Sequence, residues 1–235
     1  MTLDASTATG PTSVVGPVAG VASPGVPATG PLVGVDLGIG DELDCEADLR
    51  TLRSGLEQAG LGEGLWITTH PVGVRPDRHA AIVVALPAAG DGPAGERRAF
   101  DAVRAALASG HTHSHAVYEP AIVCGDQSVG EREALIGAYE ALAAREAGFG
   151  GRAVAFPGDQ QLIGEVTVAD ILASAVDDVV DLARGEVTPA DRVGTRDFVR
   201  PLLRDGRWVL IVQPAVGETF VPFEEPNPHR CCQDH

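Results

Sequence analysis

The densest group of reactive side chains lies at the C-terminal end of the chain. Two histidines and two cysteines fall within seven residues there, at His229, Cys231, Cys232 and His235. Thiolates and imidazoles are the ligands that Zn²⁺ and similar transition metals prefer. The pattern predicts a transition-metal site, although adjacent cysteines depart from the usual spacing of two to four residues between paired zinc ligands. The alternative is a chain end with no ligand role.

A second candidate is a row of histidines at alternate positions, His111, His113 and His115. On a strand these side chains point to the same face, so they could contribute to a metal site shared with the tail. The alternative is an exposed connection between a helix and a strand, because the preceding Gly110 has the character of a helix stop.

Three aspartates form a third candidate site. Asp91, Asp126 and Asp159 each follow a glycine that comes after a short apolar run. If these runs are neighbouring parallel strands, the carboxylates meet at the carboxyl edge of the sheet, where such folds bind ligands. Clustered carboxylates can hold a hard cation or transfer protons. The alternative is that Gly and Asp serve here only as turn residues.

Cys124 is a weaker catalytic candidate. It ends an apolar run directly before Gly125, where an α/β enzyme could carry a nucleophile, but a buried thiol that packs as a small hydrophobe is the commoner role. The sequence has no Gly-x-Ser-x-Gly motif, so a hydrolase interpretation lacks its main support.

The elements that would position these groups follow a repeated pattern. The apolar runs 82–86, 121–124 and 154–156 each lead into Gly-Asp, and a helical pattern comes next. This repetition predicts an α/β fold with a mixed, mainly parallel sheet built from three repeated βα units. Asp205-Gly206 predicts an antiparallel hairpin, which a further strand near 219–223 extends into a C-terminal meander.

Apolar periodicity predicts four helices. The first covers 45–59, the third carries an inward stripe that includes Ile136 and Tyr139, and the fourth begins with a capping box at Thr167 and continues to Val179. The inward faces of the first two helices consist of Leu49, Leu52 and Leu56, and of Phe100, Val103 and Leu107.

Composition divides the chain into three parts. Residues 1–31 are rich in Gly, Pro and Ala with one charged side chain, which predicts a disordered leader. Residues 32–224 have the length of one domain, and residues 225–235 form the His/Cys-rich tail.

Charge restricts the classes of function. The net charge is −16 and all 17 basic residues are arginines, so no lysine is present to form a Schiff base, anchor pyridoxal phosphate or bind phosphate in a P-loop. The acidic balance argues against nucleic acid and anionic membranes as partners. The leader lacks a signal-peptide pattern and the chain has only four cysteines, which favours a cytoplasmic location.

No family is recognised from the motifs of the sequence, and three functions remain open. The leading interpretation is a soluble accessory protein that binds zinc or another transition metal through the C-terminal His/Cys cluster. The second is a small-molecule enzyme with a carboxylate-lined site at the strand ends. The third is a non-catalytic interaction or regulatory domain.

Overall fold

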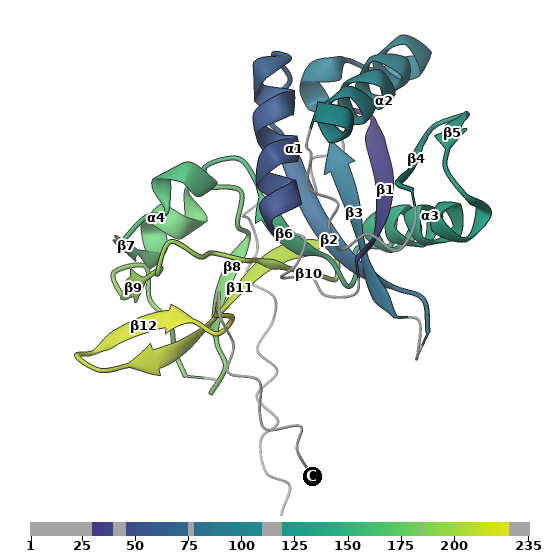
Figure 1. Ribbon diagram of the computed structural model, residues 1–235. Helices are drawn as coiled ribbons and strands as arrows, with labels where there is room; N and C mark the ends of the chain where they lie inside the picture. Colours follow the sequence, from purple (N-terminus) through teal and green to yellow (C-terminus); the bar gives the residue numbers. More distant parts are fainter. Residues whose placement is uncertain (1–29, 40–45, 75–77, 110–118, 184, 226–235) are drawn as a thin grey trace, which may run out of the picture.

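The structure is a computed structural model that describes residues 30–39, 46–74, 78–109, 119–183 and 185–225 (Figure 1). We call residues 30–156 the first half and residues 157–225 the second half. The first half contains β1 (Leu32–Ile39), α1 (Glu46–Gln58), β2 (Trp66–Val72), β3 (His79–Ala85), η1 (Pro87–Ala89), α2 (Gly92–Ser109), β4 (Ala121–Cys124), β5 (Gln127–Val129), α3 (Arg132–Glu146) and β6 (Arg152–Ala155).

The second half is built mainly from short strands. It contains η2 (Asp159–Gln161), β7 (Glu165–Thr167), α4 (Val168–Leu172), β8 (Asp178–Asp181), β9 (Arg192–Gly194), β10 (Leu202–Arg204), β11 (Arg207–Ala215) and β12 (Thr219–Pro222). The pairing of β6 with β10 joins the sheet of the first half to that of the second.

The strands form one sheet that is mostly antiparallel, so the prediction of a mainly parallel sheet of three βα units is wrong. The strand order is β5-β4-β1-β3-β2-β6-β10-β11-β12-β9-β7, with β8 also paired to β11. Among the described strands, only the β8–β11 and β9–β12 pairs are parallel.

The error has a topological cause. The three predicted strands became β3, β4 and β6, which do run in the same direction, but they are never neighbours. β1 lies between β4 and β3, and β2 lies between β3 and β6, each antiparallel to both of its neighbours. The succession β1-α1-β2-β3-α2-β4 with the order β4-β1-β3-β2 is therefore a split βαβ, or ferredoxin-like, arrangement. The sequence had predicted no strand at β1.

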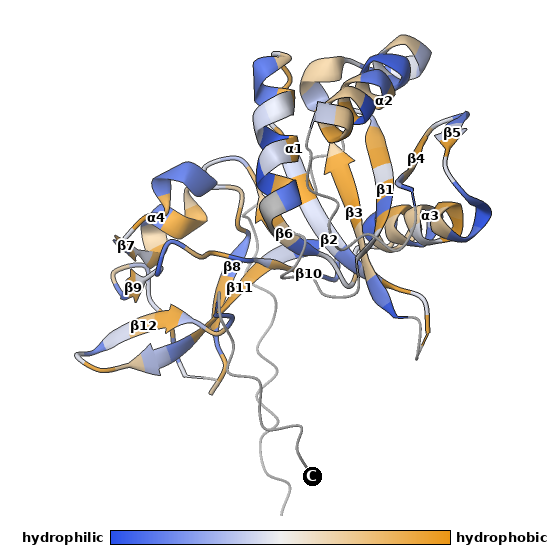
Figure 2. Ribbon diagram, viewed as in Figure 1, coloured by the Kyte–Doolittle hydropathy of each residue, from blue (hydrophilic) through white to orange (hydrophobic). Residues whose placement is uncertain are grey.

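Helices cover both faces of the first half. α1 and α2 pack against each other on one face, and the predicted inward residues of both helices are buried there. The strands beneath them alternate, so that Val33, Val35 and Leu37 of β1 point to this face. In Figure 2 the apolar β3 lies between the helices as a largely orange strand.

On the other face, α3 packs against β1 to β4 mainly through small residues together with the partly buried Leu142, and the predicted inward positions of Ile136 and Tyr139 are wrong. Ile136 and Tyr139 are each 52% exposed, whereas Gly137 and Ala138 are buried. The helix lies so close to the sheet that a Cβ on Gly34 would stand 2.6 Å from the carbonyl oxygen of Ala138. A side chain at position 34 would therefore push the helix away from β1.

In the second half, the predicted capping box and hairpin turn are found in the structure, but the predicted length of the fourth helix is wrong. The capping box is confirmed, because the Asp170 N–H donates to Thr167 Oγ1 at 3.1 Å and the Thr167 N–H donates to Asp170 Oδ2 at 2.9 Å. The helix that it starts ends at Leu172, and Val179 belongs to β8. The hairpin at Asp205-Gly206 and the strand after it are also confirmed, as β10, β11 and β12.

None of the helices in the described ranges is long and apolar enough to cross a membrane. The predicted leader (1–31) and tail (225–235) lie almost entirely outside the described residues, which include only positions 30, 31 and 225 of them.

Candidate functional site

A pocket of about 250 Å³ lies where the two halves meet. Residues from α1, the end of β6, η2 and the segment 197–200 form its walls. Its polar lining comprises three arginines (Arg50, Arg53 and Arg200), two aspartates (Asp159 and Asp197) and Gln160, and its apolar lining comprises Leu49, Val154, Ala155, Leu162, Ile163 and Val199.

The helical periodicity of α1 explains why two of the arginines lie on the same side of the helix. Leu49 and Leu52 face the core, so Arg50 and Arg53, each one position further along and three residues apart, share the neighbouring side of the helix. That side looks toward the second half, and both arginines line the pocket.

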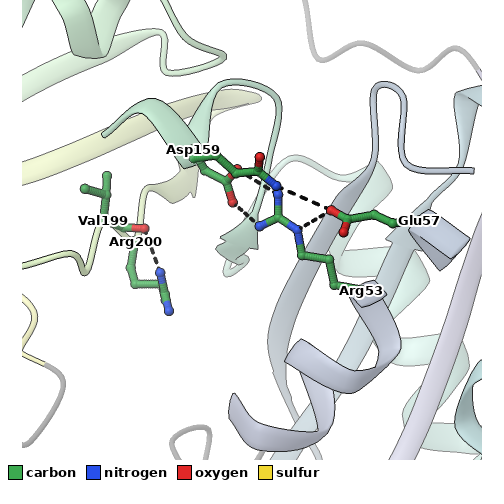
Figure 3. A network of polar contacts seen from close by, with 6 residues as sticks. Arg53, Glu57, Asp159, Val199 and Arg200 are labelled. Carbon is green, nitrogen blue, oxygen red and sulfur yellow. Dashed lines mark hydrogen bonds and ion pairs between the residues drawn. The ribbon is translucent and has the colours of Figure 1, made fainter. Parts of the chain in front are cut away.

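Arg53 connects the two halves through a bidentate ion pair (Figure 3). Its Nη1 and Nη2 donate to the two carboxylate oxygens of Asp159 at 2.6 and 3.0 Å, and its Nε donates to Glu57 at 2.8 Å. The hydrogen bonds to Asp159 raise the pKa of Arg53 further above its ordinary value. The guanidinium is therefore fixed in place and largely neutralised by its two carboxylate partners.

The pocket wall at 195–197 is held in an unusual backbone conformation. Arg196 and Asp197 both have positive φ, 53° and 54°, which non-glycine residues adopt rarely. The hydroxyl of Thr195 donates to the Gly164 carbonyl at 2.8 Å, and the Gly164 N–H donates to Asp197 Oδ1 at 2.8 Å. Two consecutive residues of this kind cost free energy, and such conformations cluster at functional sites.

Arg200 approaches the pocket from this same segment. Its guanidinium carbon lies 4.2 Å from the centroid of the Phe198 ring, and its Nη1 donates to the Val199 carbonyl at 3.0 Å (Figure 3). These contacts orient the guanidinium. The lining thus gathers three arginines on one concave site, in a chain whose net charge is −16.

The Arg53–Asp159 pair leads to a stability prediction. Asp159→Asn removes the charge and one of the two oxygen acceptors, so we expect the free energy of unfolding to fall by about 1–2 kcal/mol. Glu57→Gln is the matched control, because Glu57 is more exposed and its pair with Arg53 spans one helical turn, which is worth about 0.3–0.5 kcal/mol. Urea unfolding tests whether Asp159→Asn loses more free energy of unfolding than Glu57→Gln, and equal losses in the two variants would contradict the prediction.

The three predicted aspartates do not meet. Asp159 lines the pocket, whereas Asp91 and Asp126 are exposed and belong to other loops. All three loops leave the same edge of the sheet, but the intervening strands β1 and β2 separate successive loops by two strand spacings, about 10 Å. Gln160, the neighbour of Asp159, also lines the pocket.

Cys124 does not have the properties of a nucleophile. It is buried in the core, and burial, together with a smaller effect of the Glu96 charge, raises the pKa of its thiol to about 11. The thiol therefore stays protonated at neutral pH, and the side chain packs as a small hydrophobe.

The metal-binding prediction is corrected. The proposed ligands His111, His113 and His115 and the tail residues His229, Cys231, Cys232 and His235 all lie outside the described residues. Within the described ranges, no group of three or more His, Cys, Asp or Glu side chains is arranged to hold a metal ion.

Sequence reasoning missed the arginines and also a partly buried acid–histidine pair. Asp36 of β1 is fully buried, and His79 of β3 lies 2.8 Å from its Oδ2 through Nε2. The arginines of α1 could have been found from the helical phase, since they flank the leucine stripe. No local sequence pattern predicts the acid–histidine pair, because the two residues are brought together by the pairing of β1 with β3.

Comparison with known protein families, with curated proteins and with solved structures gives no significant match.

Proposed function

We propose that this chain is a non-catalytic binding domain that holds a small organic anion in the pocket between its two halves. The observation that carries the proposal is the convergence of Arg50, Arg53 and Arg200, from two segments far apart in the sequence, on one concave site of an otherwise acidic chain. Guanidinium groups present paired donors that match carboxylate and phosphate oxygens.

The three arginines have different tasks in this proposal. Arg53 is held by Asp159 and Glu57, so it positions the wall rather than supplying the main attraction. Arg50 and Arg200 come from different walls, one from α1 and one from the 197–200 segment, and both present guanidinium donors to the pocket. An anion between them would bridge the two halves.

The size and the apolar walls limit the ligand further. Pockets for drug-sized molecules range from about 300 to 1,000 Å³, so a volume of about 250 Å³ suits a smaller ligand. Leu49, Leu162 and Val199 offer apolar contact beside the arginines. A carboxylate or phosphate with a short apolar body fits this combination.

The carboxylates of the pocket favour binding over acid–base catalysis. Asp159 accepts two hydrogen bonds from Arg53, and Asp197 accepts one from the Gly164 backbone. Both are engaged in holding the walls, whereas a general base needs a carboxylate directed at the substrate. We therefore favour a regulatory or binding domain over the small-molecule enzyme. A cytoplasmic location, with neither nucleic acid nor membrane as partner, completes the proposal and rests on charge and composition.

Calorimetric titration with benzoate, succinate and glycerol 3-phosphate tests the proposal. We expect at least one of these probes to bind, and Arg50→Gln and Arg200→Gln each to weaken its affinity about 10-fold or more, the equivalent of about 1.4 kcal/mol. Arg104→Gln is the matched control, because Arg104 is an exposed arginine of α2 outside the pocket. Binding that all three variants retain, or no binding of any probe, would overturn the proposal.

A further inference from the structure

A second arginine site lies at the seam between the halves, away from the pocket. Arg145, in the last turn of α3, is only 3% exposed. Its guanidinium carbon lies 5.1 Å from the ring centroid of Trp208 and 5.9 Å from that of Trp66. The two indole rings are themselves stacked, with centroids 4.8 Å apart. The cation thus lies against the aromatic pair that joins β2 to β11.

The charge of Arg145 is not matched by a carboxylate. No acidic side chain in the described part of the chain pairs with it, and its Nε has no hydrogen-bond partner there. Burial lowers the pKa of the guanidinium to about 10, so it still carries its charge at neutral pH. Contact with aromatic faces compensates only part of the free-energy cost of burying an ion.

Two further buried polar atoms at the seam have no partner among the described residues, Trp208 Nε1 and His70 Nδ1. The indole N–H is a donor only. The tautomer of His70 follows from its contacts. The Thr68 hydroxyl donates to the Val83 carbonyl, so it accepts from His70 Nε2 at 2.9 Å, and Nδ1 carries no proton. Burial and, second, the charge of Arg145 lower the pKa of His70 to about 3, so the ring is neutral.

We infer that Arg145 and Trp208 together bind a small monovalent anion of halide size. Arg145 supplies a full positive charge and an unused Nε donor, and Trp208 supplies an unused indole donor. An anion that accepts from both would compensate the buried charge. Because Arg145, Trp208 and His70 are all nearly or fully buried, chloride suits this seam better than an organic anion. This site is independent of the proposed function.

The chain contains only two tryptophans, and both lie at this site, so intrinsic fluorescence reports on it directly. The experiment titrates sodium chloride into the full chain against sodium gluconate at constant ionic strength. We expect a saturable change in tryptophan emission, and a melting temperature about 2–4 °C higher at saturating chloride than in gluconate. No saturable difference between the two salts would overturn the inference.

Two variants separate binding from folding. Arg145→Met keeps the length and removes the charge, so it is expected to fold and to lose the chloride response completely. Trp208→Phe keeps an aromatic ring and removes the donor, so the half-saturating chloride concentration should rise about 10-fold. Arg50→Gln, from the other pocket, should respond as the parent chain does. An unchanged response in Arg145→Met, or a lost response in Arg50→Gln, would contradict the site.

Discussion

Gly137→Ala is expected to lower the free energy of unfolding by about 3 kcal/mol, although alanine is the better helix former by about 0.8–1 kcal/mol. Gly137 lies in the middle of α3, directly over the buried Asp36–His79 pair. A Cβ there would stand 1.9 Å from Asp36 Oδ2 and 3.2 Å from His79 Nε2. Either the helix moves away from the sheet or the pair separates, and both outcomes are costly. Denaturant unfolding measures the loss, and a value below about 1 kcal/mol would contradict this account.

A double variant tests the cause of that loss. Asp36→Ala removes the oxygen that the new methyl group would contact. We therefore expect the double variant Asp36→Ala/Gly137→Ala to lose less free energy of unfolding than the sum of the losses of the two single variants. Simple additivity would place the damage elsewhere in α3. The cycle therefore distinguishes a local clash from a general weakening of the helix.

The parts of the fold that sequence could predict are those whose signals are local. The leucine stripe of α1, the capping box at Thr167 and the hairpin at Asp205-Gly206 each depend on residues a few positions apart, and each is found as predicted. β1 was missed because it follows a Gly/Pro-rich stretch and carries two glycines of its own, Gly34 and Gly38. Yet Gly34 is what allows α3 to approach the sheet.

Because β1 was not predicted, the predicted strand order was wrong, and so was the predicted site at the strand ends. Because β1 was missed and the runs 82–86, 121–124 and 154–156 were expected to be adjacent strands, the three Gly-Asp loops looked like neighbours whose carboxylates would converge. Inserting two antiparallel strands keeps the loops at the same edge but moves them about 10 Å apart. Of the three aspartates, Asp159 alone lines the pocket, and its partner there is Arg53, 106 positions away in the sequence.

Two polar residues of the sheet are buried beneath α3, and the sequence around them does not predict this burial. His70 and Asp36 are both fully buried and lie on the face that α3 covers. Their neighbours in the sequence give no sign of this, because burial on that face depends on a helix that begins about 60 residues after His70. For His70, burial ties the stability of the fold to the protonation state of the ring.

His70 therefore makes the fold sensitive to acid. Its pKa is about 3 in the folded chain, below the ordinary value of 6.5, because burial disfavours the charged ring. Between these values the unfolded chain binds a proton that the folded chain does not. The contribution of His70 to stability is thus fully present above about pH 6.5 and is lost as the pH falls toward 3, at up to about 1.4 kcal/mol per pH unit.

Between pH 7 and pH 5, this single group should reduce the free energy of unfolding by about 2 kcal/mol. His70→Gln cannot titrate and keeps a polar group opposite Thr68, so its stability should fall by about 2 kcal/mol less than that of the parent chain over the same interval. Urea unfolding at both pH values in chloride-free buffer measures the difference and leaves the proposed anion site out of the comparison. Parallel pH profiles of the two proteins would mean that the folded chain accommodates a protonated His70, and that the contact with Thr68 does not depend on a neutral ring.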